Sequence, residues 1–296
     1  MKPPSFGYHR PDTVADALAV LAESGPDAKV LAGGQSLIPL LNMRLAAPKV
    51  LVDINRLGAE LDCIDVDEQA VRVGALVRHT RLTRPEASAG AVGGAGLSLL
   101  AEATRCVAHP TIRNRGTTVG SLVHADPAAE LPAVLVLSGG SVELASVTGA
   151  RSVPAAEFFV GPLESALAPG ELAVAARFPT PPPRSGTAFV EISRRAGDYA
   201  LAGVALQVAL GDDGLIASAR ATYLSVGATP VLVDLTDAVS GSTVDWSAAG
   251  ALAQSHVDPE DDIHATAAYR SHLVGVLTRR AGELALSRAR EAIDAQ

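Results

Sequence analysis

The chain has 296 residues, of which 48% are hydrophobic and 19% charged, so it can bury the cores of two or three structural units and is not a disordered segment. Its formal net charge of −8 and the lack of any stripe rich in lysine and arginine exclude a nucleic-acid-binding surface. No run approaches the roughly 18 apolar residues of a membrane-spanning helix and no signal peptide is visible, so we expect a cytoplasmic protein without a membrane span.

The chain has two cysteines, Cys63 and Cys106, which are far apart in the sequence. An iron–sulfur cluster needs about four thiolate ligands, so this chain alone cannot provide a cluster site. We expect both residues to be buried thiols in a reducing compartment.

The first segment of the chain, residues 1–56, is predicted to be a small subdomain that alternates helix and strand. Thr13 suits a helix N-cap, with Asp16 three residues later and apolar residues following at helical spacing. The apolar runs at 30–32 and 49–54 are typical of strands.

The strand at 30–32 ends at two adjacent glycines, which open what we call the first loop. Gly33 and Gly34 permit positive φ and leave no Cβ in the path of an approaching anion. Ser36 suits an N-cap, and Pro39 is tolerated in the first turn of the helix that follows. An anion there would meet unpaired amides and the positive end of the helix dipole. The stretch is either a phosphate-binding loop or a plain strand-to-helix turn, because short glycine-rich loops are weak signals.

A second subdomain is predicted over residues 57–178. Alternating residues over 64–77, with a turn at 67–69, predict a hairpin. The remaining elements are expected to be helices at 96–108 and 127–137, followed by strands at 142–147 and 172–178.

Residues 112–127, which we call the second loop, combine glycines with hydroxyl side chains, and two such loops can hold a diphosphate from both sides. Asp126 precedes Pro127 and suits either an N-cap for the next helix or a direct ligand contact, and the two roles are compatible. His124 is either a ligand contact or a structural hydrogen-bonding group. Glu130 is expected to compensate the dipole of the helix that it begins.

The proline-rich tract at 179–183 cannot be helix or central strand, so it is predicted to begin a C-terminal domain over residues 179–296. Strands are expected at 187–193, 204–210 and 216–226, with a hairpin turn at 212–214. A long final helix is predicted to pack into the core through a stripe made of Leu273, Leu277, Ala281, Leu284 and Ala285.

Four motifs together resemble the FAD-binding medium subunits of the molybdenum hydroxylases, the family of aerobic carbon monoxide dehydrogenase, xanthine dehydrogenase and the bacterial nicotine- and quinoline-oxidising enzymes. They lie at 32–36, at 112–126, at 193–200, and at 269–270 leading into 277–280. No complete G-x-G-x-x-G or G-K-[ST] motif is present, which argues against a Rossmann or P-loop site. The resemblance implies an α+β fold: a two-subdomain FAD-binding region of the PCMH or vanillyl-alcohol-oxidase type, followed by a C-terminal domain with a small antiparallel sheet and helices.

The resemblance further implies one FAD, with its diphosphate between the two loops and its ring near the C-terminal domain. We expect it to be bound non-covalently, since the first loop contains no histidine or cysteine. No catalytic residue set stands out, so the cofactor is expected to carry the chemistry. The cofactor-binding positions implied are Ala32, Gly33, Gly34, Gln35, Ser36, Leu37, Thr117, Thr118, Gly120, Ser121, Asp126, Leu172 and Tyr199, the last against the flavin ring.

The same resemblance implies two partners, a large subunit with the molybdenum cofactor and a small iron–sulfur subunit, assembled as a dimer of heterotrimers. Electrons would pass from the iron–sulfur clusters to FAD and then to an external acceptor. Leu201 stands where the xanthine dehydrogenase branch tends to have a lysine, which disfavours direct NAD reduction. The alternatives are a stand-alone FAD-dependent reductase of the same superfold and a scaffold subunit that has lost its flavin.

Val119 departs from the family pattern, which has a glycine at this position of the second loop. If the position needs positive φ, Val119 would be strained by roughly 1–3 kcal/mol and FAD binding would be weakened. The alternative is that the backbone there is ordinary and the family's glycine serves only close approach. If Val119 crowds the diphosphate loop, replacing it with glycine would tighten FAD binding.

Overall fold

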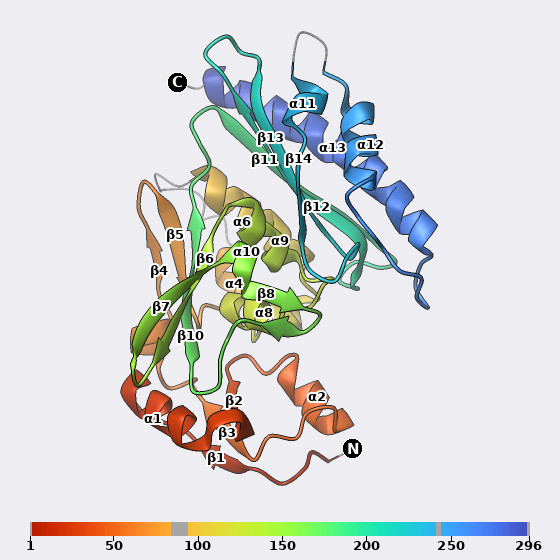
Figure 1. The fold of residues 1–296 in the computed structure, drawn as a ribbon. Coiled ribbons are helices and arrows are strands. Elements are labelled where there is room, and N and C mark those ends of the chain that lie inside the picture. The colour runs from red at the N-terminus through yellow and green to blue at the C-terminus, as the bar shows by residue number, and fades with distance from the viewer. Residues whose placement is uncertain (1, 84–93, 241–243, 295–296) are drawn as a thin grey trace.

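The computed structural model describes residues 2–83, 94–240 and 244–294. It contains three main sheets and a two-stranded ribbon, with helices packed on the sheets (Figure 1). This architecture confirms the α+β prediction. In the described part of the chain, no helix is both long and apolar enough to cross a membrane.

The N-terminal unit is a three-stranded parallel sheet in the order β1-β3-β2. The predicted N-cap is confirmed, because the Thr13 hydroxyl accepts a hydrogen bond from the Asp16 amide. Since β2 and β3 are parallel, the first loop and the residues that follow β3 emerge at the same edge of the sheet. The elements are β1 (Gly7–His9), α1 (Val14–Ser24), η1 (Gly25–Asp27), β2 (Ala28–Leu31), α2 (Leu37–Met43), β3 (Val50–Asp53) and α3 (Gly58–Leu61).

The second unit is built on a five-stranded antiparallel sheet in the order β4-β5-β10-β6-β7. The predicted hairpin is confirmed as β4 and β5. Helix α9 is buried along its whole length, because it lies between this unit and the C-terminal sheet. The elements are β4 (Ile64–Val66), β5 (Ala70–Gly74), α4 (His79–Leu82), α6 (Gly94–Cys106), α7 (Pro110–Arg113), α8 (Thr118–His124), α9 (Glu130–Leu137), β6 (Ser141–Ser146), β7 (Gly149–Pro154), α10 (Ala155–Phe158), β8 (Phe159–Gly161), β9 (Glu164–Ser165) and β10 (Leu172–Pro179).

The C-terminal unit is a four-stranded antiparallel sheet in the order β11-β12-β13-β14. One face packs on α6 and α9, and the long helix α13 lies across the other (Figure 1). The predicted turn at 212–214 joins β12 to β13, with Gly214 at φ +74°. The elements are β11 (Ser185–Ser193), β12 (Ala200–Leu210), β13 (Ile216–Leu224), β14 (Val231–Asp234), α11 (Thr236–Val239), α12 (Trp246–Gln254) and α13 (Ala267–Asp294).

The predicted apolar stripe of the final helix is correct at Leu273, Leu277, Ala281 and Ala285 and wrong at Leu284, which is 39% exposed. The buried side of α13 rotates along its length, because a helix that crosses a twisted sheet contacts it through a changing face. The predicted division of the chain at 56 and 178 stays a prediction, and β10 extends one residue past the second boundary.

Candidate cofactor site

The two loops predicted to hold a diphosphate are in direct backbone contact. A Cβ on Gly33 would lie 2.4 Å from the Arg115 carbonyl oxygen and 2.8 Å from the Gly116 Cα. Gly34 has φ +72°, the left-handed conformation that glycine adopts without strain. The first glycine is therefore required by the contact between the loops, and the second by the turn.

A chain of hydrogen bonds, which we call the Asn55 network, holds the two loops together. The Asn55 side-chain Nδ2 donates to the Ala32 carbonyl at 2.9 Å and to the Asp53 carboxylate at 2.6 Å. Arg78 donates to the Asn55 side-chain oxygen at 2.6 Å and to the Arg115 carbonyl. Sequence reasoning missed these residues. The available signal was the position of Asn55 just after β3, at the sheet edge where the first loop begins.

The second loop is more helical than the sequence suggested, since α7 and α8 occupy most of it. Thr117 is the N-cap of α8, and its hydroxyl accepts a hydrogen bond from the Gly120 amide at 3.2 Å. A Cβ on Gly120 would lie 2.6 Å from that hydroxyl oxygen. Glycine at this position therefore allows the close packing of the capped first turn.

Val119 lies inside α8 and is not among the residues with positive φ, so the predicted backbone strain is wrong. Its side chain is 2% exposed and packs in the main hydrophobic core. A helical position accepts a β-branched residue at small cost. The hypothesis of a site weakened by Val119 therefore loses its strain argument, but Val119 lines the loop cavity described below, so crowding of the diphosphate stays a prediction.

A cavity of about 530 Å³, which we call the loop cavity, lies between the two loops and extends to the segment before β12. All of the predicted cofactor-binding positions line it except Thr118, which is fully buried. Tyr199 is 71% exposed at its rim. The predicted positions that line it are Ala32, Gly33, Gly34, Gln35, Ser36, Leu37, Thr117, Gly120, Ser121, Asp126, Leu172 and Tyr199.

The loop cavity offers main-chain donors and few cations. None of the amides of residues 33–37 donates to a backbone carbonyl of the described residues. Among the described lining residues, Lys29 is the one lysine and there is no arginine. Ser36 occupies the N-cap position of α2 without a capping bond from its side chain. The cavity therefore fits a diphosphate held by backbone N–H groups.

Asp126 is not a helix N-cap, because α9 begins at Glu130 and Ala129 takes the N-cap position. Instead, its carboxylate accepts a hydrogen bond from the Ala128 amide at 2.9 Å and closes the turn before the helix. Glu130 is the first residue of α9, as the dipole-compensating interpretation requires, and its charge there stays a prediction. Burial and the nearby Glu191 charge raise its pKa to about 8.

The side chain of His79 packs against Gly116 in the second loop, a contact that was not predicted from the sequence. It is 3% exposed, and a Cβ on Gly116 would lie 2.7 Å from its Cδ2 atom. Burial and the charges of Arg113 and Arg78 lower its pKa to about 4, so the imidazole is neutral at neutral pH. His124, left open by the sequence, also lines the loop cavity.

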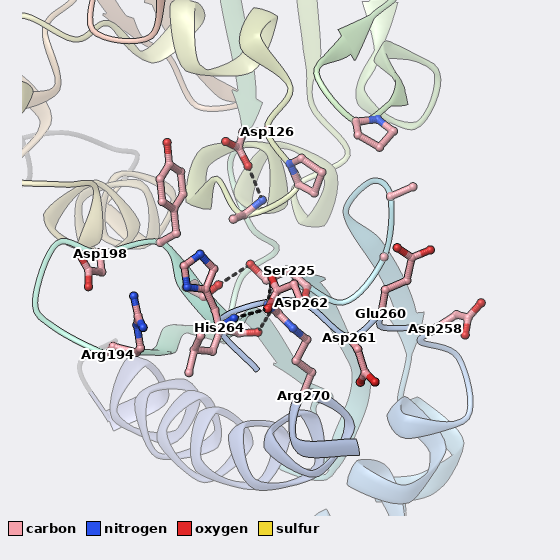
Figure 2. A pocket seen from close by; sticks show the side chains of 18 residues that line it. Asp126, Arg194, Asp198, Ser225, Asp258, Glu260, Asp261, Asp262, His264 and Arg270 are labelled. Atoms are coloured by element: carbon pink, nitrogen blue, oxygen red, sulfur yellow. Dashed lines mark hydrogen bonds and ion pairs between the residues drawn. The ribbon is translucent and has the colours of Figure 1, made fainter. Parts of the chain in front are cut away.

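A second cavity of about 590 Å³, which we call the acidic cavity, adjoins the first and shares Asp126, Ala128, Asp198 and Tyr199 with it. Figure 2 shows its carboxylates and the two arginines, Arg194 and Arg270. The other acidic residues that line it are Asp258, Glu260, Asp261 and Asp262.

Arg270, part of the motif at 269–270, is 7% exposed and joins three segments beside the acidic cavity (Figure 2). It donates to the carbonyl oxygens of Leu201 and Ser225 at 2.6 and 2.9 Å, and to the Asp262 carboxylate at 2.7 Å. Arg270 therefore links α13 by hydrogen bonds to the start of β12 and to the residue that follows β13.

The two cysteines are free and half-buried, where full burial was predicted. Burial raises the pKa of Cys106 to about 12, so its thiol is unreactive at neutral pH. Among the described residues, no group of three or more His, Cys, Asp and Glu side chains could hold a metal ion.

Comparison with known proteins agrees with this site. A family model described as the FAD binding domain in molybdopterin dehydrogenase matches residues 4–181, and one described as the CO dehydrogenase flavoprotein C-terminal domain matches residues 187–285. The alpha subunit of the 6-hydroxypseudooxynicotine dehydrogenase complex of Paenarthrobacter nicotinovorans is 43% identical, over 98% of this chain and 97% of its own. The carbon monoxide dehydrogenase medium chain of Afipia carboxidovorans is 36% identical, over 98% of this chain and 100% of its own.

Among solved structures, quinoline 2-oxidoreductase from Pseudomonas putida 86 matches with a TM-score of 0.90 at 34% identity, covering 98% of this chain and 99% of that one. The two family models together span both the loop cavity and the C-terminal sheet. The chain therefore belongs to the FAD-binding medium subunits of the molybdenum hydroxylase family.

Proposed function

We propose that the loop cavity holds one non-covalent FAD and that the chain passes electrons from an iron–sulfur subunit to an external acceptor. One observation carries this proposal. The two loops that bear the motifs are in contact and enclose one cavity, and the amides of residues 33–37 donate to no backbone carbonyl of the described residues. When bound, FAD supplies the redox chemistry, and the protein supplies binding, orientation and electrostatics.

The chain's own residues bind and orient the cofactor. The amides of residues 33–36 and the capped turn at Thr117, Gly120 and Ser121 would hold the diphosphate. Leu172 and Tyr199 both line the loop cavity, and Tyr199 directly precedes β12 of the C-terminal sheet, so the flavin ring is proposed to lie against them. Ala32 and Leu37 complete the wall of the first loop.

The proposed partners are a large subunit with the molybdenum cofactor and a small iron–sulfur subunit, in a dimer of heterotrimers. Support comes from the relatives, which are named as medium chains or as subunits of dehydrogenase complexes. The substrate would be chosen by the molybdenum subunit. A cytoplasmic location belongs to the same proposal, since the free thiols of Cys63 and Cys106 suit a reducing compartment.

The acceptor is proposed to approach through the acidic cavity. Its carboxylates repel the phosphates of a pyridine nucleotide, and Leu201 lines it without adding a positive charge. Both features disfavour the alternative of a stand-alone reductase that uses NADPH.

An absorbance spectrum of the purified protein before and after acid precipitation tests the cofactor proposal. We expect a flavin spectrum that moves entirely to the supernatant. Flavin retained in the pellet would contradict non-covalent binding, and a protein that takes up no FAD on reconstitution would contradict the binding itself. NADPH-driven turnover by the isolated chain would favour the stand-alone reductase, and a colourless chain that copurifies with two partners would favour the scaffold.

A further inference from the structure

Residues 194–199 join β11 to β12 and form what we call the β11–β12 connection. It carries Tyr199, which lines the loop cavity at its rim and whose hydroxyl makes no hydrogen bond to a described residue. Figure 2 shows Arg194 and Asp198 of the same connection beside the acidic cavity. The place of the Tyr199 ring therefore depends on how the backbone of the connection is held.

The connection touches the second unit at Gly197. This residue has φ +84°, and a Cβ built on it would lie 2.6 Å from the His109 Nδ1 atom and 2.8 Å from the Ala108 carbonyl oxygen. Only glycine allows so close an approach to a backbone oxygen and an imidazole at once. Ala108, Gly197 and Tyr199 all line the loop cavity, so this contact between two units lies in the wall of the proposed flavin site.

The surface that Gly197 approaches is itself held in place. Ala108 has φ +44° in the short turn between α6 and α7. The Arg113 guanidinium donates to the carbonyl oxygens of Val107 and Ala108 at 2.9 and 2.7 Å, and hydrogen bonds from a charged donor are strong. A side chain at residue 197 would therefore displace the β11–β12 connection and not the turn.

The connection is a compact turn that transmits such a displacement. The Arg195 carbonyl accepts hydrogen bonds from the Ser193 hydroxyl at 2.8 Å and from the Asp198 amide at 3.0 Å. These bonds link the residues before and after Gly197 to one another. A shift of Gly197 therefore moves the neighbouring residues with it.

The strand that follows Tyr199 is anchored separately. The Ser225 hydroxyl donates to the Ala200 carbonyl at 2.7 Å, and Arg270 donates to the Leu201 carbonyl at 2.6 Å. The backbone of Tyr199 thus lies between a fixed strand end and the glycine contact. Because the strand end cannot follow, a displaced connection would rotate the tyrosine away from its present place at the cavity rim.

We propose that the contact of Gly197 with Ala108 and His109 positions the Tyr199 ring against the flavin. The inference rests on the proposed FAD site in the loop cavity. The diphosphate would be held by the first and second loops, whereas Tyr199 belongs to the C-terminal unit, so the distance between the flavin and the phenol depends on how these units meet. Gly197 is a positioning residue, because it acts on the flavin through Tyr199.

Titration of the full-length, deflavinated chain with FAD, followed by flavin fluorescence, tests this inference. A phenol stacked on a flavin quenches its emission, so the bound flavin should be brighter in Gly197→Ala. The dissociation constant for FAD should rise about three- to tenfold, the loss expected when one aromatic stacking contact is weakened. Gly214→Ala is the matched control, since Gly214 lies in the next turn of the same sheet at φ +74° with nothing within 4 Å of an added Cβ. It carries a similar backbone strain without the contact and should keep the original values.

A double-mutant cycle separates positioning from general damage. If Gly197 acts through Tyr199, the chain that combines Gly197→Ala with Tyr199→Ala should bind FAD as Tyr199→Ala alone does. His109→Ala keeps the glycine and removes the exposed imidazole, so it should brighten the bound flavin to a smaller extent. This variant keeps the test decisive if Gly197→Ala does not fold.

Three results would overturn the inference. They are a folded Gly197→Ala chain with the affinity and emission of Gly214→Ala, additive losses in the double variant, and an unchanged flavin emission in His109→Ala. Failure of the original chain to bind FAD would instead contradict the proposed function.

Discussion

Gly33 shows how a single hydrogen atom in place of a side chain sets the distance between two loops. We expect Gly33→Ala to force the first loop away from Arg115, because the new Cβ would lie 2.4 Å from the carbonyl oxygen. FAD affinity should fall by at least about tenfold, or 1.4 kcal/mol, in a fluorescence titration. Gly58→Ala is the matched control, since nothing lies within 4 Å of its added Cβ. Equal affinities for the two variants would show that the loops can separate without cost.

Val119 leads to the opposite prediction from the one that the family pattern suggested. Val119→Gly removes a buried side chain from a helix, so it should lower the free energy of unfolding by about 2–4 kcal/mol. FAD affinity, measured separately, should not improve. Val147→Gly is the control, because Val147 is 59% exposed between two strands. Tighter FAD binding by the Val119→Gly chain would show that the Val119 side chain crowds the second loop.

At the scale of the elements, the Asn55 network joins the N-terminal sheet to the second unit. Asn55→Ala removes the donor to the Ala32 carbonyl and leaves Arg78 without its 2.6 Å partner. We expect a loss of about 1–3 kcal/mol in unfolding free energy by denaturant titration, together with weaker FAD binding. Among the described residues, the neighbouring Arg56 forms one exposed ion pair, with Asp12, so Arg56→Ala should cost less than about 1 kcal/mol. Similar losses in the two variants would argue against a structural role for the network.

At the scale of the whole molecule, two glutamates that are partly or fully removed from solvent, Glu191 and Glu130, make stability depend on pH. Glu130 and Glu191 have pKa values raised to about 8 and 7, so the folded chain keeps protons that the unfolded chain has lost above about pH 5. Stability should therefore fall as pH rises toward 8. His79, with its pKa lowered to about 4, acts below pH 6.5, where it makes stability rise with pH.

Glu130→Gln isolates this effect in the window from pH 6.5 to 8. The original chain should lose about 1–2 kcal/mol more unfolding free energy across that window than the variant does. Thermal unfolding at the two pH values measures the difference, with Glu157→Gln, at an exposed position on α10, as the reference. If the variant has the same pH dependence as the original chain, a residue other than Glu130 must be the titrating group.

Local signals were sufficient to predict about half of the helices and strands from the sequence, including the long α13, while elements such as β1, α8 and α12 were not predicted. The Thr13 cap, the hairpin at 67–69 and the turn at 212–214 were correct, because capping and turn formation depend on residues close together in the chain. The family motifs identified positions that the structure brings to one cavity. Order along the chain does not reveal distance in space, so the contact between Gly33 and Arg115 could not be read from the sequence.

The sequence by itself determined the mixed α+β character, the glycine-bearing first loop and the membership of a flavoprotein family, because composition, periodicity and motifs are properties of the chain. Only the tertiary structure decided the helical backbone at Val119 and the turn closed by Asp126. It alone decided the raised pKa of Glu130, which arises where α9 is buried beneath β12 and β13. The physical reason is that desolvation and charge proximity depend on which elements pack together, and packing joins residues that are far apart in sequence.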